Sequence, residues 1–260
     1  MRVFSGSRAS GVVLIFALLL LWEMSVRLGW VTSENWPAFS SVLKALWSGI
    51  FSGELLGATV SSLWRMAAGY ALGVSLGVVL GLAMARSRLV RLTLEPSVEL
   101  LRPLPAVAII PPLIFLLGVD DAFKIAIVAF ATFFPVVVNT MSGVFAVDSV
   151  YLQVASTFGV SPRVTLVRVI FPASLPFVLA GMRISLSIAL IVTVVAEMLA
   201  GSEGIGYHVL AMQHAMRAAD MYAAIIILAL VGYASNRVFL EIEAQAIHWA
   251  RLGENLERKQ

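Results

Sequence analysis

Six stretches of the sequence are apolar over about twenty residues each, the length that an α-helix needs to cross the hydrocarbon core of a bilayer. Only 13% of the 260 residues are charged and 60% are hydrophobic, whereas roughly a quarter of the residues are charged in a soluble domain. The same composition excludes a disordered chain. We expect an all-α polytopic membrane protein with about six transmembrane helices. The expected spans are 11–28, 59–85, 98–119, 123–147, 176–199 and 221–239.

The Lys and Arg residues of the short connections predict which ends of the helices face the cytoplasm. They concentrate before the first span, after the second, between the fourth and fifth, and after the sixth, and such residues favour the cytoplasmic side. We therefore expect both termini in the cytoplasm. This orientation requires that 98–119 crosses the membrane although four prolines interrupt it, because a count of five spans would place Arg163 and Arg168 outside. The four prolines are Pro103, Pro105, Pro111 and Pro112.

These expectations divide the chain into three parts. Residues 1–58 form an N-terminal transmembrane helix and an outer surface segment, in which 42–50 is amphipathic. Residues 59–245 form a core of five transmembrane helices with a cytoplasmic loop at 148–172, and 246–260 form a cytoplasmic tail. A cleaved signal peptide is the alternative for the first span, but no small-x-small site follows it, so we expect the span to be retained.

Glycine recurs at every fourth position through the second span. A stripe of small residues lets a second helix approach closely in lipid, so the stripe predicts a helix-packing face. The same segment contains the hydrolase pattern G-x-S-x-G around Ser75, but that motif needs a sharp strand-to-helix turn, which an unbroken apolar helix does not provide. We favour packing over an intramembrane hydrolase. The stripe consists of Gly69, Gly73, Gly77 and Gly81.

Ionisable residues inside the expected spans are candidates for function, because charge at membrane depth is costly. Arg65, Arg183 and Glu197 are candidates for lining a pathway through the membrane, as is the polar Asn139. Arg65 lies near the outer end of its span, so it could instead extend to the interface. Arg102, at the inner end of the third span, could contact a lipid headgroup. Arg183 and Glu197 are too far apart on one helix to pair, so each needs another partner or water.

The sequence also excludes several kinds of chemistry. It has no cysteine, which excludes disulfides, thiolate metal sites and cysteine nucleophiles. A P-loop needs a lysine directly after a glycine, and none of Lys44, Lys124 and Lys259 follows one. His208 and His214 are six residues apart rather than four, so we expect no metal site. We therefore expect that the chain is not an enzyme and that any ATP hydrolysis belongs to another polypeptide.

The connection between the fourth and fifth spans carries the most specific pattern. The stretch 153–159, followed by Val169-x-Phe171-Pro172, resembles the EAA loop of ABC-importer permeases, E-A-A-x3-G-x9-I-x-L-P. Gln153 stands where that family has Glu, so a hydrogen bond remains available from this position but a charge contact does not. Small residues in the short helix expected at 150–158 would let it seat closely in a groove of a partner. The resemblance implies ATPase coupling through Gln153, Ala155, Ser156, Gly159 and Pro172.

The resemblance extends from about residue 53 to the last span. Over this range the chain resembles the permeases of the nitrate/sulfonate/taurine importer group, and it departs from them mainly in the Gln153 loop and at an additional proline, Pro112. The matching motifs are Ser62-x2-Arg65-x3-Gly69, Leu101-Arg102-Pro103-Leu104-Pro105, Ile110-Pro111, Phe115-x2-Gly118, Lys124-Ile125, Phe133-Phe134-Pro135, Asn139-Thr140, Ala196-Glu197-Met198 and Gly204-x-Gly206-Tyr207.

What this family does is therefore the expectation for the chain. The resemblance implies the type I importer fold in the inner membrane, a homodimer of permeases, two cytoplasmic ATPase subunits that bind ATP and Mg, and an external binding protein that delivers substrate. It implies import of a small anion such as a sulfonate, taurine or nitrate. A neutral heterocycle such as a vitamin precursor, carried by the same mechanism, is one alternative. An ion-coupled secondary transporter that uses Glu197 and the histidines as a proton relay is the other.

Overall fold

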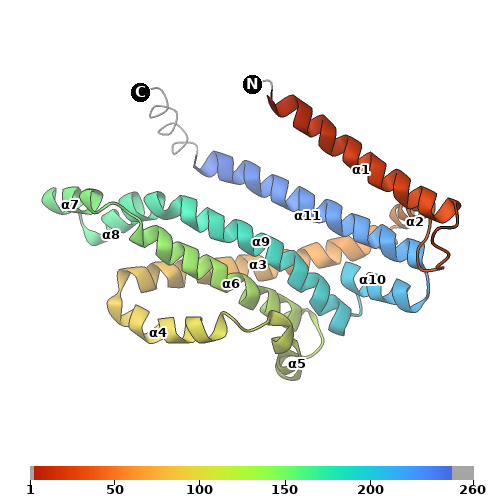
Figure 1. Cartoon of the computed structure of the whole chain (residues 1–260). Helices are drawn as coiled ribbons and strands as arrows, with labels where there is room; N and C mark the ends of the chain where they lie inside the picture. The colour runs from red at the N-terminus through yellow and green to blue at the C-terminus, as the bar shows by residue number, and fades with distance from the viewer. Residues whose placement is uncertain (1–2, 248–260) are drawn as a thin grey trace.

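The computed structural model describes residues 3–247, and this part of the chain is built from helices without any strand (Figure 1). In chain order the elements are α1 (Val3–Arg27), α2 (Phe39–Phe51), α3 (Glu54–Arg86), α4 (Arg88–Leu101), α5 (Ala106–Leu117), α6 (Asp121–Phe145), α7 (Ser149–Thr157), α8 (Pro162–Thr165), the π-helical turn η1 (Leu166–Ile170), α9 (Phe171–Ala200), α10 (Ile205–His214) and α11 (Ala218–Ala246).

Five helical segments are long and apolar enough to cross a membrane, and the number is six if a bent pair of helices, α4 and α5, is counted as one span. The expected span at 98–119 is wrong in where it begins, because α4 begins at Arg88; α4 then meets α5 at an angle of 103°. The break lies at Pro103 and Pro105, which have no backbone N–H to donate, and Pro105 is extended with ψ 122°. Pro111 and Pro112 lie inside α5 without interrupting it.

The glycine stripe of α3 lies against α6. A Cβ added at Gly69 would lie 2.6 Å from Val128 Cβ, and one added at Gly81 would lie 2.7 Å from Thr140 Cβ, so the two backbones lie close together over about three helical turns. Residue numbers increase together along both helices, which makes α3 and α6 parallel. The pairs are Gly69–Val128, Gly73–Thr132, Gly77–Val136 and Gly81–Thr140.

Parallel packing of α3 and α6 determines how the chain between them runs. Because both helices start at the same end of the bundle, residues 87–120 have to return from one end to the other, and α4 and α5 make this crossing (Figure 1). By contrast, α9 is antiparallel to α6, since Gly181 contacts Asn139 while Gly143 contacts Ser174. Ser185 Oγ donates to the Thr132 carbonyl over 2.8 Å and ties the same two helices together.

The long helix α9 starts earlier than the expected span at 176–199. Helical structure is continuous from Pro162 to Ala200, through α8, η1 and α9. Pro172 and Pro176 therefore lie within this helical run rather than at its start. Each proline removes a backbone donor, and the wider turn of η1 lies directly before the first of them. The cytoplasmic loop expected at 148–172 is accordingly helical over most of its length.

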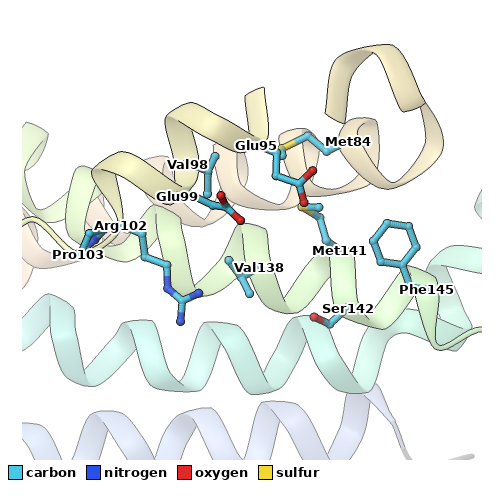
Figure 2. A pocket seen from close by; sticks show the side chains of 10 residues that line it. All are labelled: Met84, Glu95, Val98, Glu99, Arg102, Pro103, Val138, Met141, Ser142 and Phe145. Carbon is cyan, nitrogen blue, oxygen red and sulfur yellow. The ribbon is translucent and has the colours of Figure 1, made fainter. Parts of the chain in front are cut away.

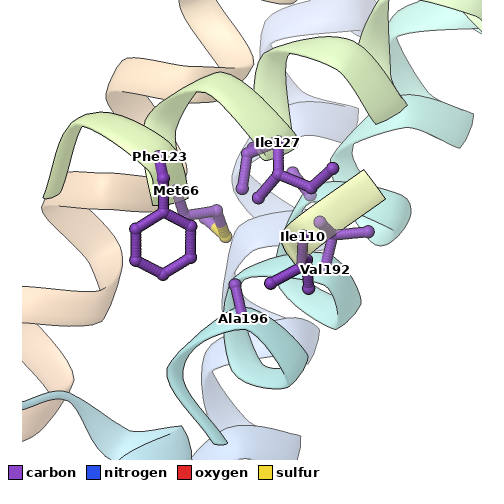
Figure 3. Packing of buried hydrophobic residues seen from close by; sticks show 8 residues of the cluster. Met66, Ile110, Phe123, Ile127, Val192 and Ala196 are labelled. Carbon is purple, nitrogen blue, oxygen red and sulfur yellow. The ribbon is translucent and has the colours of Figure 1, made fainter. Parts of the chain in front are cut away.

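Two apolar clusters hold the helices together. The larger cluster joins α3, α5, α6 and α9, and α5 enters it through the buried Ile110 (Figure 3). The second cluster seats α2 and α10 against α3 and α11. The first contains Met66, Ile110, Phe123, Ile127, Val128, Ala189, Val192 and Ala196, and the second contains Val42, Leu55, Ile205, Val209, Ala223 and Ala224.

The first transmembrane helix is attached at its C-terminal end. Trp22 of α1 stacks within 5.5 Å of Trp36, Phe39 and Tyr222, measured between ring centroids. Its indole N–H also donates to the Pro37 carbonyl over 3.0 Å. None of the window Ser10–Arg27 is fully buried, so α1 lies at the side of the bundle and contacts it through this aromatic group.

The close contact between α3 and α6 generates a stability prediction. An alanine methyl at position 73 would overlap Thr132 Oγ1 and the Ala129 carbonyl. We expect Gly73→Ala to destabilise the protein by about 1–3 kcal/mol through overpacking, seen as a lower melting midpoint of the detergent-purified protein. Gly57→Ala is the matched control, because Gly57 lies on the same helix with open space around it. Equal midpoints for the two variants would contradict this account of the packing.

Candidate functional site

One end of the bundle contains a buried ion pair between α3 and α9. Arg65 is 4% exposed and Glu197 is fully buried. Arg65 Nη1 donates to Glu197 Oε1 over 3.1 Å. Taking each charge out of water costs several kcal/mol unless pairing and hydrogen bonds offset it, so both residues need additional partners.

Arg65 finds these partners on α6 and on the loop that follows α9. Its Nε lies 2.6 Å from Asp121 Oδ1. Its Nη1 lies 3.3 Å from the Glu203 carbonyl oxygen, and its Nη2 lies 3.4 Å from the Glu203 carboxylate. The buried Lys124 lies 3.5 Å from the same Asp121 oxygen. All three guanidinium nitrogens thus donate to oxygens of the chain itself, and the cluster holds two positive and three negative side chains.

The Glu197 carboxylate is also held by a serine and by the backbone of the next helix. Ser62 Oγ donates to Glu197 Oε2 over 2.7 Å and accepts from the Ile205 N–H over 2.8 Å. The Gly206 N–H donates to Oε2 over 3.0 Å. Gly204 has φ +103°, and a side chain at this position would overlap the carboxylate. The carboxylate is therefore enclosed by donors, and glycine is required where the backbone approaches it.

This arrangement joins two residues that the sequence suggested as separate pathway candidates. Arg65 is buried and pairs with the buried Glu197, and it also reaches Asp121 and Glu203, whose side chains are 49% and 68% exposed at this end of the bundle. Chemically, the cluster links the ends of α3, α6, α9 and α10, and its net negative charge does not suit an anion. Asp121 and Glu203 were not identified from the sequence. The sequence pattern Ser62-x2-Arg65 places Ser62 and Arg65 on one face of a helix, but it does not point to Asp121 or Glu203.

The other two pathway candidates lie away from this ion cluster. Arg183 lies on the exposed side of α9 and has no hydrogen bond or ion pair within residues 3–247. Asn139 is half-buried on α6, and its side-chain N–H donates to the Pro135 carbonyl over 2.7 Å. The structure therefore brings Arg65 and Glu197 together, but it does not bring Arg183 or Asn139 to them.

Two hollows lie where α4 and α5 cross α6. The larger, about 640 Å³, lies between α4 and α6 and includes the carboxylates Glu95 and Glu99 (Figure 2). The smaller, about 390 Å³, is lined by α5, α6 and α9 and includes Asn139. Arg102 lines both, so they meet at the break between α4 and α5.

The short helix α7 projects at the end of the molecule opposite to α10 (Figure 1). Asp148 caps it by accepting from the Val150 N–H over 2.9 Å. Gln153 and Ser156 are exposed, while Ala155 is the buried residue of this helix. α7 therefore exposes Gln153 and Ser156 together with the apolar side chains of Val150, Tyr151 and Val154 within the described part of the chain.

A left-handed glycine ends α7. Gly159 has φ +65°, a conformation that favours glycine at the end of a helix. The Val160 N–H donates to the Ala155 carbonyl over 2.9 Å, and the Gly159 N–H donates to the Ser156 carbonyl over 3.0 Å. Pro172 lies in the first turn of α9. The turn at Gly159 thus leads from α7 directly into the helical run that contains α9.

The remaining polar candidates do not assemble into a catalytic or metal site in the described residues. Ser75 is exposed in the middle of the unbroken helix α3, with no strand-to-helix turn near it. His208 is buried with Nδ1 3.4 Å from Glu54 Oε1, and His214 ends α10. Within residues 3–247 no group of three or more His, Asp or Glu could hold a metal ion.

The parallel α3–α6 pair, the break between α4 and α5 and the projecting helix α7 lie largely within a part of the chain that matches a known family. The model of the family described as the binding-protein-dependent transport system inner membrane component matches residues 73–242. The chain belongs to this family. It is therefore the membrane-spanning permease subunit of an ABC importer, and the family's role is transport rather than enzymatic catalysis.

Curated relatives match over most of their length. The putative aliphatic sulfonates transport permease protein SsuC of Bacillus subtilis is 33% identical, over 92% of this chain and 87% of that protein. The protein of the same name from Escherichia coli is 31% identical over 89% and 88%. The taurine transport system permease protein TauC of Escherichia coli is 29% identical over 83% and 80%.

Solved structures share the fold. An inward-facing MetNI methionine ABC transporter chain matches with TM-score 0.58 and 18% identity, over 74% of this chain and 96% of that one. A chain of an amino acid ABC transporter, solved with histidines, matches with TM-score 0.62 and 15% identity, over 77% and 95%. The type I importer permease fold expected from the sequence is confirmed.

The ion cluster leads to a second prediction, tested by melting of the purified permease. Arg65→Met leaves Glu197 buried without its cation, which typically costs about 3–5 kcal/mol, so we expect a strong loss of thermal stability. The double variant Arg65→Met with Glu197→Gln should recover part of that loss, because the buried charge is removed as well. Removing the exposed pair Arg217–Asp220 at the same end is the control, with about 0–1 kcal/mol expected. A single variant as stable as this control would rule out a buried charge cluster.

Proposed function

We propose that this permease passes a small sulfonate- or taurine-like anion into the cytoplasm, driven by two cytoplasmic ATPase subunits that bind ATP and Mg. An external binding protein delivers the substrate to the end that contains the ion cluster. A second copy of the chain completes the pore as a homodimer. Relatives with sulfonate and taurine names support the substrate class.

One structural observation carries the coupling part of this proposal. α7 projects from the bundle, its exposed side offers Gln153 and Ser156, and it is joined through Gly159 to the helical run of α8, η1 and α9. A partner that grips α7 and moves would displace α9, which spans the membrane. ATP binding would thus shift the permease between two states, and substrate acts through its different affinity for them.

The same proposal includes the orientation in the membrane. α7 and the basic residues near it, such as Arg163 and Arg168, belong on the cytoplasmic side. The beginning of α1 and the end of α11 point toward the end with α7 (Figure 1), which supports placing both termini in the cytoplasm. The Arg65–Glu197 cluster then lies near the external face of the inner membrane.

We expect Gly159→Val to uncouple transport from ATP hydrolysis. Valine is strained at φ +65°, so the turn and the seat of α7 would change while the membrane helices stay folded. The measurement compares ATPase rate and uptake of ³⁵S-labelled alkanesulfonate in proteoliposomes containing the whole transporter. Gly29→Val is the matched control, because Gly29 also has positive φ and open space but lies at the other end. Full, ATP-coupled uptake by Gly159→Val would argue against coupling through α7.

The orientation can be tested by labelling, since the natural chain has no cysteine. We expect Ser156→Cys to react with a membrane-impermeant maleimide in inverted vesicles and to be protected in intact spheroplasts. Ser202→Cys, exposed in the loop before α10, should show the opposite pattern. Labelling of Ser156→Cys from the outside would overturn the proposed orientation and the docking of a cytoplasmic ATPase on α7.

A further inference from the structure

The smaller hollow has a single charged residue in its lining. Arg102 supplies it, and the other lining residues given by the described chain are apolar apart from Asn139. In the larger hollow the same Arg102 shares the lining with Glu95 and Glu99. The two hollows thus differ in charge, and the smaller one is positive.

The Arg102 guanidinium is not neutralised by the chain. Within residues 3–247 it forms neither a hydrogen bond nor an ion pair, although Glu99 is three residues away on the same helix. In Figure 2 its side chain points away from α4, whereas the Glu99 carboxylate stays close to that helix. Arg102 contrasts with Arg65, whose three nitrogens all have oxygen partners.

The break in the membrane-spanning pair places further positive character beside Arg102. α5 begins at Ala106, which lines the smaller hollow. The first N–H groups of a helix lack partners within it, and in broken membrane helices such ends face anionic ligands. No hydrogen bond to the Ala106 or Val107 N–H is found in the described structure. This helix end supports the site that Arg102 and the hollow define.

The rest of the smaller hollow is apolar. Phe130 and Phe134 of α6 stack edge to face with ring centroids 4.9 Å apart, and Ile184 and Ile188 of α9 also line the hollow. Its volume of about 390 Å³ falls within the usual range of roughly 300–1,000 Å³ for small-molecule sites. A ligand that fits has one negative end and a short hydrocarbon part.

We propose that the smaller hollow binds the oxyanion of an alkanesulfonate-type substrate during transport, and that Arg102 selects its negative charge. The planar guanidinium can donate two parallel N–H groups to two oxygens of one sulfonate, and the side chains of Phe130, Phe134 and Ile188 contact the alkyl group. This inference rests on the proposed permease function and adds the residue and the ligand class. The phosphate of an anionic lipid offers the same chemistry, so the test has to separate the two sources.

The experiment uses the whole transporter, with ATPase and binding protein, in proteoliposomes of phosphatidylcholine with or without phosphatidylglycerol. The probes are ³⁵S-labelled methane-, butane- and hexanesulfonate. We expect Arg102→Gln to lower kcat/KM for ATP-driven uptake about ten- to hundredfold with either lipid, as for loss of a hydrogen bond to a charged group. Arg102→Lys, which keeps the charge without the planar fork, should lose less. Arg237→Gln on the exposed face of α11 is the control and should match wild type.

A variant of the apolar wall provides a readout that general destabilisation would not give. Ile188→Trp narrows the hollow, so uptake of hexanesulfonate should fall more than uptake of methanesulfonate. Equal loss for all three chain lengths would overturn the assignment of this wall, and this variant remains informative if Arg102→Gln does not fold.

Three outcomes distinguish a transported sulfonate from a bound lipid, and they separate failure of this inference from failure of the proposed permease function. Wild-type uptake by Arg102→Gln would overturn the inference while leaving the permease function intact. Loss of copurified phosphatidylglycerol from Arg102→Gln together with unchanged uptake would assign the hollow to lipid and also overturn it. Absence of ATP-driven uptake of all three sulfonates by the wild-type transporter would instead overturn the proposed substrate class itself.

Discussion

The direct contact between the backbones of α3 and α6 determines most of the architecture. Four glycines bring the two helices together in parallel. The chain that connects two parallel membrane helices has to cross back to the side from which the first helix started. Parallel packing also places Arg65, about three turns into α3, beside Asp121 at the start of α6. The ion cluster is therefore a consequence of the glycine stripe.

The return crossing is where the molecule is least regular. α4 and α5 meet at 103°, so backbone groups at the break cannot all be satisfied by helical hydrogen bonds. Irregular backbone is tolerated at membrane depth where it lines a cavity, and both hollows lie at this break. The uncompensated charge of Arg102 and the compensated charge of Arg65 consequently have different roles: one faces a hollow, while the other ties helices together.

Much of this fold follows from the sequence because hydropathy and length limit what can cross a bilayer. Most of the expected ends of the spans lie within a few residues of the observed ends of α1, α3, α6, α9 and α11. The expected boundary between residues 58 and 59 falls inside α3, because this helix begins at Glu54. Periodicity identified the glycine stripe but not its partner, because one sequence holds no information about which helix fills the groove.

The ion pair between Arg65 and Glu197 does not follow from the sequence for the same reason. Arg65 and Glu197 are 132 residues apart, and their contact depends on how α3, α6 and α9 assemble. The bend was misjudged because four prolines were treated alike, whereas only Pro103 and Pro105 lie at it, and Pro111 and Pro112 continue a helix. The helices packed around each proline decide whether it breaks or continues its helix, and the sequence alone does not show which helices these are.

The π-helical turn at Leu166–Ile170 has a geometrical consequence for the two ends of the permease. A π turn holds one residue more than an α turn, and one residue corresponds to about 100° of rotation around a helix. The direction in which α7 leaves the axis of α9 therefore depends on a single extra residue. A chain shortened by one residue in this turn would present α7 on a different side of the molecule, out of alignment with whatever surface receives it.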